Sequence, residues 1–258
     1  MGDVTRALRT WRERRRVSQL ELALRAGTTQ RHVSFIESGR SAPGRSMMIR
    51  LAEALEVPLR ERNALLLGAG FAPVYEEMPL EDPKLDAVRT ALERILHGHL
   101  PYPAVITDRH GDLLIANPAF GALTDGVAPD LLAPPVNVAR LLLHPRGMAP
   151  RIANLDEWGW HIIDAAQREA ERNPSERSAT LVAELEQLMP DGHRQPGPDH
   201  IGFAVPLRLR ADEGELQLLT TLTHFGTATS VTLAELRLEA FLPADQATAE
   251  ILAARVNR

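Results

Sequence analysis

The sequence contains no cysteine, which excludes disulfide bonds, thiolate nucleophiles and cysteine-based zinc sites. Long apolar runs are also missing. No stretch approaches the length of about eighteen residues that spans a bilayer, and the segment MGDVTRALRTWRERRR has no apolar core of the signal-peptide type. Aromatic residues make up only 4% of the chain. We therefore expect a cytoplasmic protein with a mainly aliphatic core.

Sequence motifs that carry catalysis are missing as well. The chain has no nucleophile elbow, no Walker loop and no H-E-x-x-H sequence. Gly68-Ala69-Gly70 resembles the start of a dinucleotide fingerprint, but it follows the helical run NALLL and lacks the third glycine. His97 and His99 have no further ligands at metal spacing. We expect no catalytic residues, no metal ion and no cofactor.

Positive charge is concentrated in the first quarter of the chain. Positions 1–70 hold thirteen arginines and seven acidic residues, whereas the whole chain has a net charge of −5. A basic segment joined to an acidic one is typical of a protein in which only the first part meets a polyanion. The length of 258 residues suits two domains.

The basic segment is predicted to form about five short helices, two of which make a helix-turn-helix. In the run SQLE, Ser18 caps a helix and Glu21 reaches back, as in a capping box. This helix ends at Gly27, which can adopt the left-handed conformation. Thr28 caps the next helix, over residues 29–38. Two helices joined by a short turn with one glycine are typical of DNA-binding proteins.

The second helix of this pair carries candidate base contacts on one face. Positions at i, i+1, i+4 and i+5 fall together on it, and they hold Gln30, Arg31, Ser34 and Phe35. Gln30 suits an adenine edge, Arg31 a guanine edge and Phe35 a thymine methyl. Residues that flank the helix at the level of the DNA phosphates are Gln19, Arg40 and Arg45. The alternative is a small helical domain with solvated polar residues and a buried Phe35.

Residues 4–67 resemble the XRE-type, Cro-like repressor family. The matching runs are SQLELA, GTTQ, ESGR, Pro43 and LAEALEVP, in the family's order. The resemblance implies that Gln19 anchors a phosphate, that the start of the second helix faces bases, and that Arg12 pairs with Glu37. The predicted DNA-contact set is Gln19, Thr28, Thr29, Gln30, Arg31, Ser34, Phe35, Arg40 and Arg45.

The rest of the chain has the element order of a PAS-type domain. A linker over 71–83 carries three prolines and four acids. Strands are predicted at 104–107, 113–116, 201–210, 215–225 and 235–242, with helices at 152–171 and 178–189 between the early and late strands. The predicted fold class is α+β: an N-terminal all-α five-helix domain (1–70), then a PAS-like α/β domain (84–258) with an antiparallel five-stranded sheet.

A curved sheet with helices over one face encloses a cavity, and such cavities are mostly apolar. The predicted ligand-pocket residues are Phe120, Leu123, Arg140, Leu142, Trp158, Ile162, Phe203, Leu222 and Phe225. The alternative for each apolar member is ordinary core. Arg140, His144 and His161 are cations that could meet a ligand carboxylate, although surface contacts would explain them equally well.

The second half also resembles the ligand-binding domain of MmyB-like transcription regulators. The runs that carry the resemblance are GDLLIANPAFGALT, NVARLLLHPRGMAPRI, HFGT and LRLEAFLPADQATAEIL. The resemblance implies a one-component regulator whose second domain binds a small molecule of fatty-acid or similar lipid-like character.

The expected function is sequence-specific DNA binding by a homodimer on a palindromic operator, controlled by that ligand. Two readings of the second domain stay open beside it. It could act without any ligand, in dimerisation or partner recruitment, or it could hold haem or flavin, in which case the purified protein would be coloured.

Overall fold

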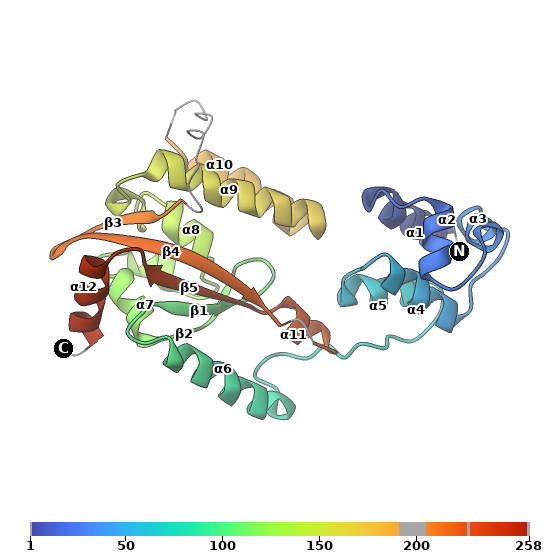
Figure 1. The fold of residues 1–258 in the computed structure, drawn as a ribbon, viewed down its shortest axis with the longest axis horizontal. Helices are drawn as coiled ribbons and strands as arrows, with labels where there is room; N and C mark the ends of the chain where they lie inside the picture. Colours follow the sequence, from blue (N-terminus) through green and yellow to red (C-terminus); the bar gives the residue numbers. More distant parts are fainter. Residues whose placement is uncertain (1, 191–204, 226–227, 257–258) are drawn as a thin grey trace. The chain divides into compact units, whose positions relative to one another are not determined.

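The computed structural model describes residues 2–190, 205–225 and 228–256, which form two compact units. One unit is helical and runs to Pro79, and a short stretch that ends at Ala234 belongs to it as well. The other unit begins at Leu80 and contains the sheet (Figure 1). Within the described residues, no helix has the length and apolarity that crossing a membrane requires.

Five helices build the helical unit, as predicted. They are α1 (Gly2–Arg14), α2 (Gln19–Arg25), α3 (Gln30–Glu37), α4 (Arg45–Ala54) and α5 (Leu59–Gly68). Leu8, Leu22, Ile36, Met48 and Leu51 are fully buried among them. Burying such side chains stabilises each by about 1.5–3 kcal/mol relative to exposure. Helices α2 and α3, with Gly27 at a φ of 61° between them, form the helix-turn-helix.

The helix caps differ in two details from the sequence prediction. Ser18 caps α2 through a hydrogen bond from the Glu21 backbone N–H, but the Glu21 carboxylate does not reach back. It accepts instead from Arg25 Nε at 2.8 Å, one turn along the helix. Helix α3 begins one residue later than predicted, because Thr29 and not Thr28 accepts from the His32 backbone N–H.

A charged network ties α1 to the end of α3. Arg12 donates to both carboxylate oxygens of Glu37, with Nε–Oε1 at 2.7 Å and Nη2–Oε2 at 2.9 Å. The Glu37 side chain is only 4% exposed, so these bonds compensate for its desolvation. The ion pair expected from the family resemblance is confirmed, and Gln19 joins it by donating to Glu37 Oε2.

The second unit contains one antiparallel five-stranded sheet with the strand order β2-β1-β5-β4-β3 (Figure 1). The strands are β1 (Ala104–Thr107), β2 (Leu113–Ala116), β3 (Leu207–Ala211), β4 (Gly214–His224) and β5 (Arg237–Pro243). The predicted fold class is confirmed, and β1 and β2 have the predicted bounds. The first four residues of the predicted third strand, 201–204, lie outside the described residues.

Helices cover the sheet and close the core. Helices α8 (Val138–Leu143), α9 (Leu155–Arg172) and α10 (Glu176–Leu188) pack against one another over one face (Figure 1). Gly159 permits the close approach of Met189 to α9, since a Cβ there would lie 2.6 Å from its sulfur. The remaining helices are α6 (Asp86–Gly98), which contacts β1, and the pair α7 (Pro118–Leu123) and α12 (Gln246–Val256), which contact each other. Short 3₁₀ turns occupy Pro83–Leu85, Pro129–Leu132 and Ala149–Arg151.

A short helix, α11 (Val231–Glu235), lies between β4 and β5. The strand predicted at 235–242 begins later, because α11 occupies its first residue and β5 begins at Arg237. Ser230 starts this helix, because its hydroxyl and its carbonyl accept from the backbone N–H groups of Leu233 and Ala234. A five-residue helix spans little more than one turn, too short to produce a helical periodicity in the sequence.

Candidate DNA-contact surface and ligand cavity

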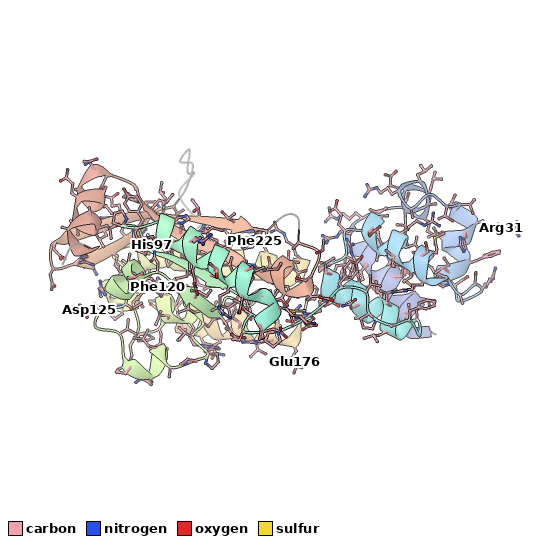
Figure 2. The ribbon with its side chains drawn as sticks, turned by 90° about the horizontal axis from the view of Figure 1, so that it is seen from below. Arg31, His97, Phe120, Asp125, Glu176 and Phe225 are labelled. Carbon is pink, nitrogen blue, oxygen red and sulfur yellow. The ribbon has the colours of Figure 1, made fainter. Side chains whose placement is uncertain are left out.

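Helix α3 presents the predicted polar face to solvent. Val33 and Ile36 are completely buried on its inner side, whereas Gln30 and Arg31 are exposed. Arg31 projects from the outer surface of the helical unit in Figure 2. An exposed helix face with one amide and one guanidinium near its N-terminus is the geometry that reads base edges in the major groove.

Phe35 lies beside two of the predicted arginines. The guanidinium carbon of Arg31 is 5.1 Å from the ring centroid and that of Arg40 is 5.9 Å away. Both distances are within the range of a cation–π contact. Phe35 is half-buried, so its ring packs partly against the protein while the two guanidiniums lie against it.

Three of the predicted contacts have hydrogen bonds inside the protein. One Gln19 amide N–H points to Glu37, the Thr28 hydroxyl bonds the His32 ring at 2.9 Å, and the Thr29 hydroxyl caps α3. Ser34 is half-buried. These side chains therefore stabilise the helical unit, and the exposed hydrogen-bond donors near α3 include those of Gln30, Arg31, Arg40 and Arg45.

Arg45 stands at the first residue of α4, where it is exposed. Gly44 caps this helix without a side-chain hydrogen bond, so the free backbone N–H groups of the first turn face solvent together with the guanidinium. A helix N-terminus with a neighbouring cation favours a phosphate. Within the described part of the chain, neither Arg31, Arg40 nor Arg45 has an ion-pair partner.

The segment that follows α5 is fixed to the helical unit by a buried asparagine. The Asn63 side chain donates to the Tyr75 carbonyl at 2.7 Å and accepts from the backbone N–H groups of Val74 and Tyr75 at 3.0 and 3.1 Å. Arg60 and Glu77 form an ion pair at 2.5 Å. The chain after α5 is therefore an ordered strap, which we define as residues 71–79.

Helix α11 holds the far end of this strap. The Thr232 hydroxyl donates to the Met78 carbonyl at 2.6 Å and accepts from the Met78 backbone N–H at 3.2 Å. The Val231 backbone N–H donates to the Glu76 carbonyl at 2.8 Å. These three bonds join the strap to a segment that continues directly into β5.

The sheet unit contains a cavity of about 310 Å³ between α8, α9, α10 and the ends of β4 and β5. Its apolar wall consists of Val138, Ala139, Leu142, Ile162, Ala165, Ala166, Leu181 and Leu222. The described β3 pairs only with residues 214–218 of β4. Leu222, beyond that pairing, remains 49% exposed. The volume of the cavity is at the lower end of the range for small-molecule sites.

Of the eight predicted pocket residues that the structure describes, three line this cavity: Leu142, Ile162 and Leu222. Phe120, Leu123 and Trp158 belong to the closed core. Phe225 is half-buried and does not line the cavity, and Phe203 lies outside the described residues. Arg140 lines a separate hollow of about 340 Å³, where Glu184 binds it at 2.6 and 2.7 Å.

The polar side of the cavity is formed mainly by α9, β5 and the β1–β2 turn. Arg237 forms an ion pair with Glu169 of α9, and Arg109 forms one with Glu235 at 3.4 Å. Glu239, two residues after Arg237, has no hydrogen bond or ion pair among the described residues. Burial raises the pKa of Glu239, and the attraction of Arg237 opposes this shift only in part.

His110 is the second polar group of note in this wall. Its Nε2 accepts a hydrogen bond from Arg109 Nε at 3.0 Å, while its buried Nδ1 has no partner in the described structure. Burial, followed by the charge of Arg109, lowers the pKa of His110. Both effects favour the neutral form of the ring.

Two family models match the chain in the order of these units. A model described as "Helix-turn-helix" matches residues 8–62. The model of the "MmyB-like transcription regulator ligand binding domain" matches residues 88–254, well over half of the chain. The chain belongs to the MmyB-like transcription regulator family. The resemblances seen in both halves of the sequence are thereby confirmed.

Individual relatives of this MmyB-like regulator cover less of it. The "Uncharacterized HTH-type transcriptional regulator y4dL" of Sinorhizobium fredii (strain NBRC 101917 / NGR234) is 41% identical over 56 residues, which are 22% of this chain and 29% of that protein. A solved structure, "Structure of an RNA-binding Light-Oxygen-Voltage Receptor", aligns with 98% of this chain and 64% of its own at 16% identity and a TM-score of 0.31. This last likeness is too weak to bear on the fold.

Sequence reasoning did not single out Glu239, which lines the cavity of this MmyB-like domain. In the run RLEAF, alternation places Arg237, Glu239 and Phe241 on one face of β5. Phe241 is a core residue, so the other two face inward as well. An acid on the core-facing side of a strand was the available signal.

Proposed function

We propose that this MmyB-like regulator binds operator DNA through α3 and the start of α4 and that a small apolar ligand in the sheet unit controls this binding. The observation that carries the first part is the exposed face of α3, with Gln30 and Arg31 beside the unpaired Arg40 and Arg45. The basic charge of residues 1–70 supplies the attraction for phosphates.

A homodimer would place two α3 helices in successive major grooves, about one turn of DNA apart. The operator would then be a palindrome with half-sites about 10 base pairs apart, centre to centre. Within each half-site, Gln30 and Arg31 read bases, whereas Arg40 and Arg45 contact phosphates.

The ligand is a small molecule of lipid-like character, a class that includes fatty acids and their alcohol and amine counterparts. Support comes from the aliphatic wall of the cavity and its volume of about 310 Å³. The cavity favours this reading over a domain that serves only in dimerisation, since such a domain needs no space in its core.

The strap offers a route between ligand and DNA. The cavity residues Arg237 and Glu239 begin β5, α11 directly precedes β5, and Thr232 of α11 holds the strap that Asn63 fixes to α5. A ligand that binds one arrangement of β5 more tightly than another would shift α11 and the strap by the same free energy.

The experiment that tests this function is a selection of bound sequences from a random duplex pool by the purified full-length protein. We expect one palindromic motif to emerge, with occupancy that changes when an octyl amphiphile is added. Recovery of no motif, at low as well as moderate salt, would reject sequence-specific binding.

A further inference from the structure

Of the two carboxylates that line the cavity of the sheet unit, Glu169 is paired with Arg237, whereas Glu239 has no partner among the described residues. Glu239 lines the cavity from β5 opposite Leu222 of β4, its partner in the strand register. Its carboxylate has neither a hydrogen bond nor an ion pair within the described residues. A desolvated carboxylate without a partner is costly, and such groups are rare unless they have a role.

The cationic side chains that surround Glu239 either form ion pairs with other carboxylates or are exposed to solvent. Arg237 is paired with Glu169 and Arg109 with Glu235. His110 is half-buried, and burial followed by the charge of Arg109 lowers its pKa. The remaining cationic side chains of the lining, Arg168, Arg172 and His224, are exposed. No described cation therefore neutralises Glu239 by direct contact, and a bound molecule can do so.

We propose that the ligand of this cavity carries a hydrogen-bond donor, a hydroxyl or an ammonium group on an aliphatic chain, and that this donor binds the Glu239 carboxylate. The inference rests on the proposed ligand-sensing function and specifies the chemistry of its ligand. The aliphatic chain lies against Leu142, Ile162 and Leu222, and the donor replaces the water that Glu239 loses.

The same geometry disfavours a carboxylate at the polar end. An anionic head group beside Glu239 adds like-charge repulsion inside the cavity. Its alternative is to lie at Arg168 and Arg172, where both guanidiniums are exposed and a pair contributes at most about fivefold to affinity. A donor on the buried carboxylate is worth about tenfold or more.

The test is isothermal titration calorimetry of the full-length protein at neutral pH with four probes that carry an aliphatic chain of seven or eight carbons. These are octylamine, 1-octanol, methyl octyl ether and octanoate. We expect octylamine and octanol to bind at least about tenfold more tightly than octanoate. Octanol should also exceed the ether, which lacks only the donor.

Two variants connect this preference to Glu239. Glu239→Gln keeps the shape and removes the charge, so octylamine should lose about tenfold while the ether changes little. Glu239→Leu removes the acceptor and should bring octanol down to the affinity of the ether. The control is Glu250→Gln, the same change on the exposed face of α12, which should bind as the unaltered chain does.

The outcomes separate the two proposals. Octanoate equal to or tighter than octylamine, or an amine preference that survives in Glu239→Gln, overturns the role of Glu239 and leaves the cavity as a ligand site. Absence of binding by all four probes overturns the ligand-sensing function and this inference with it. The duplex selection reports on DNA binding independently of both.

Discussion

The two units of this regulator differ in whether a carboxylate withdrawn from solvent has hydrogen-bond partners. In the helical unit, Glu37 accepts hydrogen bonds from Arg12 and Gln19 and is fully compensated. In the sheet unit, Glu239 is enclosed with no bonded partner in the described structure. The first arrangement fixes a rigid surface for DNA, whereas the second leaves a polar group available to a ligand. Removing the partner of Glu37 should therefore destabilise the protein, whereas removing the charge of Glu239 should stabilise it.

The largest expected effect is on the compensated carboxylate. Arg12→Ala leaves Glu37 buried and without its main partner, so the free energy of unfolding of the helical unit should fall by about 3 kcal/mol or more. Urea denaturation monitored by circular dichroism measures this. Arg9→Ala removes an exposed pair with Glu13 on the same helix and should change the free energy of unfolding little. Equal losses in the two variants would show that Arg12 contributes no more than a surface ion pair.

The rigid surface itself can be divided into base and phosphate contacts. Arg31→Ala should cost about 1–3 kcal/mol on the selected operator and relax one base position. Arg45→Ala should weaken binding to all duplexes and reduce the salt slope by about one. Fluorescence anisotropy over a salt series distinguishes them. A uniform loss for Arg31→Ala would reassign it to a phosphate.

Weakening the hydrogen bonds of the strap tests whether ligand binding in the sheet unit changes DNA binding by the helical unit. Thr232→Val removes both hydrogen bonds to Met78, about 0.5–1.5 kcal/mol each. Ligand affinity should stay near that of the unaltered chain, while the effect of the ligand on DNA binding shrinks. Thr180→Val is a matched control, since that hydroxyl donates to a carbonyl within α10. Full coupling in Thr232→Val, measured as the shift in operator affinity with octylamine, would exclude the strap as the route.

The smallest effect concerns pH. Because burial raises the pKa of Glu239 in the folded protein, the folded state holds this proton more firmly than the unfolded chain does. Its contribution to stability is full below the unfolded pKa of about 4.3 and is lost as pH rises through the higher folded pKa. Glu239→Gln should raise the Tm of the sheet unit by roughly 2–4 °C at neutral pH and change it little in acid. Calorimetry at both pH values checks the sign.

The sequence predicted the helical unit more fully than the cavity, for a physical reason. Local backbone geometry determines a helix cap such as Ser18, a turn residue such as Gly27 and the inward positions of Val33 and Ile36. Short sequence patterns are enough to predict these features. β1 and β2 were likewise found, because a tight turn separates two apolar runs. Apolar residues such as Trp158 were expected in the pocket and lie in closed core, since apolarity predicts burial but not whether the neighbouring space is filled.

Long-range contacts lie beyond such reasoning. Thr232 meets Met78 across more than half of the chain, and nothing near either residue indicates the other. Arg140 was expected to meet a ligand, yet Glu184 binds it from a helix 44 positions away. Polar side chains on a surface find partners that sequence spacing does not reveal.

Because α11 belongs with the strap, the DNA-binding half of this protein is not one continuous piece of sequence. A fragment cut after Pro79 loses Thr232 and Val231, the residues that hold Glu76 and Met78 in place. A hybrid regulator that joins residues 1–79 to another sensor domain would lack the hydrogen bonds that hold the end of the strap, unless α11 were included as well. The boundary of this unit is therefore set by contacts, and a gene fusion designed from the linear sequence alone would separate the strap from α11.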